Sequence, residues 1–124
     1  MNKLLLTAVL FLGLTFSLSA QDKSKNASVH TKAEVLQSKM SGIYLFTMPQ
    51  GTTEATVKQS ANYYTNYFTV SFDASSHVAK ITMLNNDEKS RHIICRFLIS
   101  SGVDKVTMEG SEFTVDEFYN AYIK

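Results

Sequence analysis

The sequence FTVSFDASSHVAKITM, residues 68–83, determines the predicted fold of this chain. Residues 68–73 alternate strictly between apolar and polar side chains, and residues 79–83 alternate in the same way. Such alternation is typical of a strand with one buried side and one solvent-facing side. The intervening residues 74–77 are small or polar and suit a hairpin loop. The stretch therefore predicts two antiparallel strands joined by a hairpin.

The residues before this hairpin predict a strand and then a helix. Residues 43–48 read IYLFTM and are bounded by Gly42 and Pro49. A short, mostly apolar run of this kind indicates a strand that is apolar on both faces and therefore central. A helix is expected over about residues 52–64, because a threonine at its start can accept a hydrogen bond from the first turn.

The residues after the hairpin predict a helix, a strand and a closing helix. Residues 85–88 offer caps and acidic first-turn residues, an apolar stripe at helical spacing follows, and residues 101–102 (Ser-Gly) end that helix. Residues 103–108 form a further expected strand. Residues 114–117 read TVDE, which is a capping box and indicates an amphipathic helix at the end of the chain.

The predicted order of elements is strand, helix, strand, strand, helix, strand, with one additional C-terminal helix. Two crossovers joined by a hairpin predict an α+β fold with a ferredoxin-like βαββαβ arrangement, in which two helices cover one face of a four-stranded antiparallel sheet. We expect this domain to occupy residues 41–124. Residues 21–40 are expected to form a polar tether, within which the spacing of Ala33, Leu36 and Met40 permits a short helix.

The first residues have the pattern of a secretory signal peptide. Lys3 precedes an apolar run over residues 4–14, and the segment ends in small residues at 17–20. The run is shorter than the roughly 20 residues that span a bilayer. No cysteine lies near the expected cleavage site after Ala20, so no lipid anchor is expected. We predict a secreted or periplasmic product without a stable membrane anchor.

Charge and cysteine content exclude some classes of protein. Lys3 is one of 12 basic residues, so its removal with the signal peptide leaves 11 basic against 11 acidic residues. A nucleic-acid partner is not expected, because such proteins carry a basic excess or stripe. The single cysteine, Cys95, has no partner for an intramolecular disulfide. The domain must therefore be held together by its apolar core.

Residues 43–108 resemble the heavy-metal-associated domain, a ferredoxin-like fold found in copper and zinc chaperones and in transport ATPase tails. The resemblance is carried by the order of elements, by Met48 after the first strand, by the strand at 70–73 leading through a short loop to 79–81, and by 101–103 before the last strand.

That family binds a soft metal ion through a Met-x-Cys-x-x-Cys loop between the first strand and the first helix. In this chain the two cysteine positions of the loop correspond to Gln50 and Thr53. An amide and a hydroxyl are poor ligands for a thiophilic ion. The resemblance therefore implies the fold with its metal site missing, and it transfers the family's function to no residue of this chain.

Cys95 has the side chain with the widest range of functional chemistry, because a thiol can act as a nucleophile or as a metal ligand. It lies beside the apolar stripe of the second predicted helix, so a buried core position is expected. One alternative is a small cysteine-dependent enzyme, because His92 lies three residues earlier on the same helix face. Another is a periplasmic metal-handling protein that uses methionine or histidine ligands, with Met48, His92 and Cys95 as the candidate metal ligands.

We expect an exported, non-catalytic binding or interaction module with no catalytic residue, no cofactor and no resident metal. Its expected partner is another protein. The two alternatives, metal handling and cysteine-dependent catalysis, remain open from the sequence.

Overall fold

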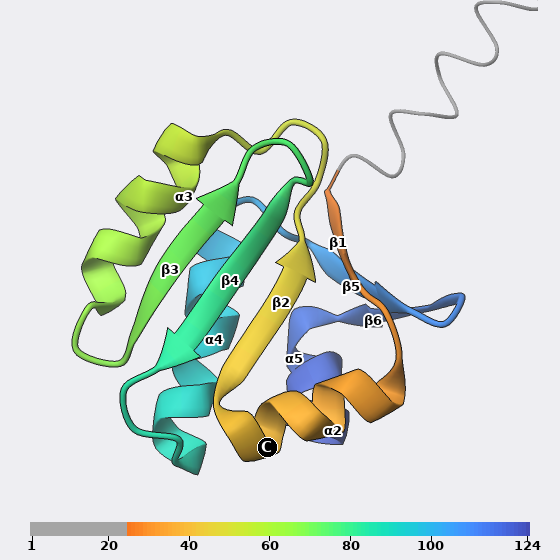
Figure 1. Cartoon of the computed structure of the whole chain (residues 1–124). Coiled ribbons are helices and arrows are strands. Elements are labelled where there is room, and N and C mark those ends of the chain that lie inside the picture. The colour runs from red at the N-terminus through yellow and green to blue at the C-terminus, as the bar shows by residue number, and fades with distance from the viewer. Residues whose placement is uncertain (1–24) are drawn as a thin grey trace, which may run out of the picture.

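The computed structural model describes residues 25–124 (Figure 1). The predicted signal peptide at 1–20 and the first residues of the predicted tether lie outside the described residues. Within the described part, strands and helices alternate in an α+β arrangement, which confirms the predicted class. The strands are β1 (Asn26–Val29), β2 (Ile43–Thr47), β3 (Phe68–Asp73), β4 (Val78–Met83), β5 (Lys105–Met108) and β6 (Ser111–Thr114). The helices are α2 (Lys32–Ser41), α3 (Glu54–Ala61), α4 (Glu88–Ser100) and α5 (Val115–Phe118), with a 3₁₀ turn η1 (Asn62–Tyr64) and a π-helical turn η2 (Tyr119–Ile123).

In residues 25–124 the strands form a single six-stranded sheet in the order β3-β4-β2-β1-β5-β6. β1 and β5 run parallel, whereas all other neighbouring strands are antiparallel. The prediction of a four-stranded antiparallel sheet is therefore wrong. The four predicted strands are present as β2 to β5, but β1 lies between β2 and β5, and β6 extends the sheet at one edge. Ala27 of β1 lies opposite Val106 of β5, and Ser28 lies opposite Thr47 of β2.

β1 and α2 also correct the predicted tether over residues 21–40. Residues 26–29 are a strand inside the sheet, and residues 32–41 are a helix, so the folded domain begins near Asn26 rather than at residue 41. The sequence did not predict β1 because this strand buries little apolar surface. Of its four side chains only Ala27 is fully buried. A strand of small and polar residues gives no hydrophobic alternation to recognise.

The short helix that the sequence permitted in this segment is confirmed as α2. The Thr31 side chain caps it by accepting a hydrogen bond from the backbone N–H of Glu34 at 3.2 Å. Gly42 ends it with φ of 78°, a left-handed conformation that glycine adopts without steric cost. The Gly42 carbonyl then accepts a hydrogen bond from Met83 N–H at 2.8 Å, which fixes the turn from α2 into β2 against β4.

The core lies between one face of the sheet and helices α3, α4 and α5. Phe46 of β2 packs edge-on against Phe118 of α5, with ring centroids 6.3 Å apart. Phe68 of β3 packs in the same way against Phe97 of α4 at 5.9 Å. All four rings are almost fully buried. Edge-to-face aromatic pairs of this kind contribute about 0.5–1.5 kcal/mol beyond the area that they bury.

The other face of the sheet is largely open. Figure 1 looks onto this face, with α4 and α5 behind the sheet and α2 along its lower end. β2 is central, as predicted, but its outward-facing Ile43 and Leu45 are 38% and 56% exposed. This strand is therefore apolar on both faces but buried on only one of them. The connections β2–α3–β3 and β4–α4–β5 both place their helices on the core side, and this leaves the outer side without a helical layer.

The end of the chain is tied back to α4 by Arg91. Its guanidinium donates hydrogen bonds to the carbonyls of Ile123 at 2.9 Å and Lys124 at 3.0 Å. It also donates to the carbonyl of Asn86 at 2.8 Å, before the start of α4. One side chain thus satisfies backbone carbonyls from two segments that are far apart in sequence. This connection holds α5 and η2 against α4.

Candidate functional site

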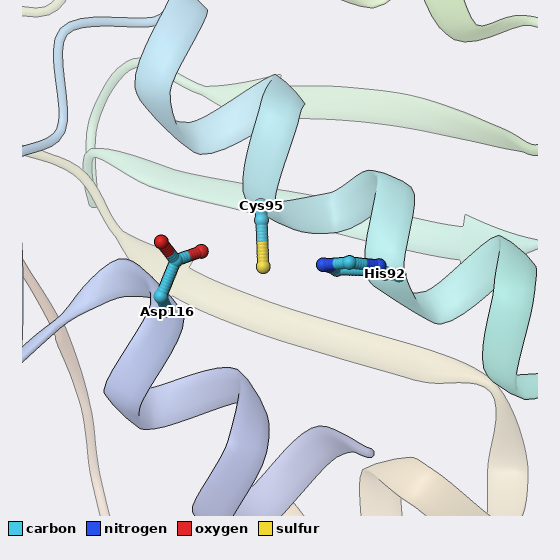
Figure 2. Close-up of side chains that lie close together, drawn as sticks. All are labelled: His92, Cys95 and Asp116. Carbon is cyan, nitrogen blue, oxygen red and sulfur yellow. The ribbon is translucent and has the colours of Figure 1, made fainter.

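Two features of the described residues have the composition of a functional site, and the first is a cluster of three side chains between α4 and α5. His92 and Cys95 lie three residues apart on one side of α4, and Asp116 lies in the first turn of α5. One potential ligand atom from each of the three lies within 4.8 Å of the others. Figure 2 shows the Cys95 sulfur between the Asp116 carboxylate and the His92 ring. Among residues 25–124 this is the only group of three or more such side chains close enough to share a metal ion.

The positions of these side chains follow from the local fold. His92 stacks on the ring of Tyr119, with centroids 4.3 Å apart and planes 17° from parallel, so the imidazole has a fixed orientation. Thr114 and Glu117 form the predicted capping box, which fixes the first turn of α5 and with it Asp116. Cys95 is 5% exposed, whereas His92 and Asp116 are exposed. The cluster therefore has a buried base and an open rim.

The thiol of Cys95 is not activated. Burial, and then the negative charge of Asp116, raise its pKa from 9.0 to about 12. A reactive cysteine needs the opposite, a pKa lowered by a positive neighbour or a helix N-terminus. In the described part of the chain no hydrogen bond or ion pair joins any two of His92, Cys95 and Asp116. The arrangement therefore lacks the connected nucleophile and base that a cysteine enzyme requires.

Met48, the third metal candidate from the sequence, lies in a different place. It is buried at the end of β2, and its backbone N–H donates to the carbonyl of His77 at 2.8 Å. Met48 lines a separate pocket with Gln50 and His77 that includes none of the three clustered residues. The structure therefore brings His92 and Cys95 together and places Asp116, rather than Met48, beside them.

Asp116 was missed because nothing in the sequence connects it to α4. It is the third residue of the TVDE capping box, where an acid is expected for helix capping alone. Its proximity to Cys95 depends on how α5 packs on α4. Only the three-dimensional structure contains that information.

The second feature is a groove on the open face of the sheet, between α2 and β2. It has a volume of about 450 Å³ and is partly open to solvent. Its apolar lining comes from Val29, Val35, Ile43 and Leu45. Its polar rim includes His30 and Glu34, whose side chains lie 3.2 Å apart. No sequence pattern indicated this groove, because β1 and α2 were expected to be a tether.

Comparison of the chain with family models, with curated proteins and with solved structures finds no match. The class that the fold defines is an α+β protein with a mixed six-stranded sheet. None of the helices in residues 25–124 is long and apolar enough to cross a membrane.

Proposed function

We propose that this chain is an exported, non-catalytic binding module that holds a segment of another protein in the groove between α2 and β2. One observation carries the proposal. Ile43 and Leu45 lie exposed at the centre of a sheet face that the domain itself leaves open, beside a groove with further apolar lining. Apolar side chains exposed in a group, rather than singly, mark interaction sites in soluble proteins.

The form of the groove favours a protein partner over a small molecule. Small-molecule sites enclose most of their ligand, whereas this groove is partly open to solvent. Protein interfaces instead combine an apolar centre with a polar rim. Here the outward positions around Leu45 are polar: Lys80 of β4 lies directly opposite it, and Thr82 of β4, Ser28 of β1 and Thr47 of β2 itself lie nearby. A partner segment that inserts one or two apolar side chains beside Leu45 matches this pattern.

The strand order supports a ferredoxin-like core as the scaffold of the module. β2, α3, β3, β4, α4 and β5 follow the βαββαβ order, and in our proposal β1 is an added strand between the first and last strands of that core. The resemblance to heavy-metal-associated domains is part of the same proposal. Gln50 and Thr53 lie in the loop between β2 and α3, and Thr53 caps α3 with its side chain. That loop serves as a helix cap here, which fits a relative without the family's metal loop.

The signal-peptide pattern of residues 1–20 supports export. Catalysis by Cys95 is disfavoured, because its thiol is buried and its pKa is raised to about 12. A thiol in that state is almost entirely protonated at neutral pH and is a poor nucleophile.

The test is a selection of random displayed peptides on the purified protein. We expect peptides with apolar side chains to be enriched on the wild type and to be lost on Leu45→Asp. Ile99→Asp is the matched control, because Ile99 lies on α4 and is 57% exposed, compared with 56% for Leu45. The control should keep the enriched peptides and their affinity.

Two results would overturn the proposal. The first is equal binding of the enriched peptides to wild type and Leu45→Asp. The second is a concentration-dependent dimer in sedimentation experiments that Leu45→Asp abolishes, because the groove would then bind a second copy of this chain. Circular dichroism of each variant checks that the fold is retained.

A further inference from the structure

We propose that His92, Cys95 and Asp116 form a zinc-binding site at the junction of α4 and α5, with water as the fourth ligand. The proposal is independent of the peptide groove, which lies on the opposite face of the sheet. It rests on the convergence of one nitrogen, one sulfur and one oxygen donor within 4.8 Å of one another. In Figure 2 all three side chains point toward a common space.

The donor set selects among metal ions. A thiolate is a poor ligand for the hard ions Mg²⁺ and Ca²⁺, which prefer oxygen donors. Cu(I) prefers sulfur donors, and this cluster has only one. Zn²⁺ is borderline in softness and accepts sulfur, imidazole nitrogen and carboxylate oxygen together. A site of three protein ligands and one water is a common zinc arrangement.

The geometry requires only a small adjustment. Zinc–ligand bonds of roughly 2.0–2.3 Å place the donor atoms of a tetrahedral site about 3.5 Å apart. The present donors lie within 4.8 Å, so they must approach one another by about 1 Å on binding. Exposed Asp116 supplies most of this movement, because the His92 ring is stacked on Tyr119 and Cys95 is buried.

Charge and proton balance are satisfied in the bound state. The Cys95 S–H bond breaks, the proton passes to solvent, and the sulfur electron pair forms the bond to zinc. The neutral imidazole of His92 contributes a nitrogen lone pair, and Asp116 contributes an ionised oxygen. One thiolate and one carboxylate then neutralise the two charges of Zn²⁺, with no oxidation or reduction.

The bonding state of the three side chains also fits a ligand site. In residues 25–124 no hydrogen bond or ion pair engages the side-chain donor atoms of His92 or Asp116. A histidine and a carboxylate placed for surface electrostatics alone would gain from pairing directly. Here they flank a thiol instead, and the ring of His92 is held by Tyr119 rather than by a hydrogen bond.

The experiment uses the chain in the processed form that is isolated from the producing cell. Bound metal is first removed with a chelator, and Zn²⁺ uptake is then measured. We expect one Zn²⁺ per chain in native mass spectrometry. The variants His92→Gln, Cys95→Ala and Asp116→Asn should each weaken binding by at least about tenfold, the lower end of the loss seen for residues that only support metal ligands. The controls His30→Gln and Asp104→Asn change an exposed residue of the same type and should bind zinc as the wild type does.

Co²⁺ provides a second, spectroscopic readout of metal coordination by the thiolate. A cobalt–thiolate bond gives a charge-transfer absorption band in the near ultraviolet, so the wild type with Co²⁺ should show this band and Cys95→Ala should lack it. If Cys95→Ala fails to fold, the exposed positions His92 and Asp116 carry the affinity test and the wild-type band still reports the thiolate.

Absence of stoichiometric zinc, or zinc binding that His92→Gln and Asp116→Asn leave unchanged, would overturn the proposal. Equal loss in the control variants would do the same, since it would indicate adventitious surface binding. Leu45→Asp should retain zinc. Failure of the peptide-binding proposal and failure of the zinc proposal are therefore separable.

Discussion

Tyr44 illustrates how a single residue can limit stability within a well-packed core. Its side chain is 2% exposed, and its hydroxyl has no hydrogen-bond partner among the described residues. Burial raises its pKa from 10.0 to about 12, against a smaller opposite effect of the nearby charge of Arg91. A buried polar group without a partner costs free energy, so removing it is neutral or stabilising. We expect Tyr44→Phe to raise the free energy of unfolding by about 1 kcal/mol, measured by urea denaturation.

The matched control for Tyr44 is Tyr63→Phe. Tyr63 is 74% exposed, so its hydroxyl is hydrated in both the folded and the unfolded protein. We expect no change in the unfolding midpoint for this variant. A loss of stability in Tyr44→Phe would mean that the hydroxyl has a partner, such as an ordered water, that the packing of the described residues does not reveal.

Cys95 gives a second prediction at the scale of a single residue. Since its thiol is 5% exposed and its pKa is about 12, the thiolate population at neutral pH is very small. We expect thiol-reactive reagents to label the native metal-free protein at least about a hundredfold more slowly than the urea-unfolded protein. The measurement is the rate of colour release from a disulfide reagent. Equal rates in both states would revive the cysteine-enzyme alternative, with His92 as its base.

At the scale of the element, the first turn of a helix is stabilised by side-chain caps that can be predicted from the sequence. Thr114 Oγ1 accepts a hydrogen bond from Glu117 N–H at 3.1 Å, and Glu117 accepts one from Thr114 N–H at 2.9 Å. Loss of such a cap costs about 1 kcal/mol, and we expect this loss for Thr114→Ala in urea denaturation. Thr65→Ala, at an exposed position after η1, should change stability by less than half of that. Because α5 carries Asp116, the cap variant should also weaken zinc binding if the proposed site exists.

The cap of α4 predicts how stability depends on pH. The backbone N–H of Ser90 bonds to the Asp87 carboxylate at 2.8 Å, and this bond, followed by the Ser90 side chain, lowers the pKa of Asp87 below 3.8. A lowered folded-state pKa means that the ionised form favours folding. Its contribution is present above the unfolded value and is lost as the pH falls through the folded pKa. Asparagine caps helices about as well but does not titrate. We therefore expect the stability difference between wild type and Asp87→Asn to shift toward the variant below pH 3.8, measured by urea midpoints across the acid range.

At the scale of the whole molecule, sequence patterns located elements well where those elements bury an amphipathic face. The alternation over residues 68–83 and the apolar stripe of α4 correspond to β3, β4 and α4 within a residue or two. β1 escaped prediction because its one buried side chain, Ala27, carries almost no hydrophobic signal. The zinc cluster escaped in part for another reason, since Asp116 reaches Cys95 only through the packing of α5 on α4. Local patterns reveal what a segment buries, but they do not reveal which segments meet.

The position of β1 gives the prediction that most directly separates the structure from the expected tether. Ala27 is fully buried between β2 and β5 on the helix-covered face, whereas Ser28 points to the open face. Ala27→Leu must force additional methylene groups into a packed core, and we expect a loss of about 1–3 kcal/mol in urea denaturation. Ser28→Leu adds a similar volume on the open side and should change stability by less than about 0.5 kcal/mol. In a tether neither substitution would matter, so equal stability of both variants and the wild type would remove β1 from the sheet.

The inserted strand would also explain why the groove exists, because β1 leads directly into α2, whose side chains form one wall of the groove facing Ile43 and Leu45. A large loss in Ala27→Leu alone would therefore support both the six-stranded sheet and the geometry on which the proposed peptide groove depends.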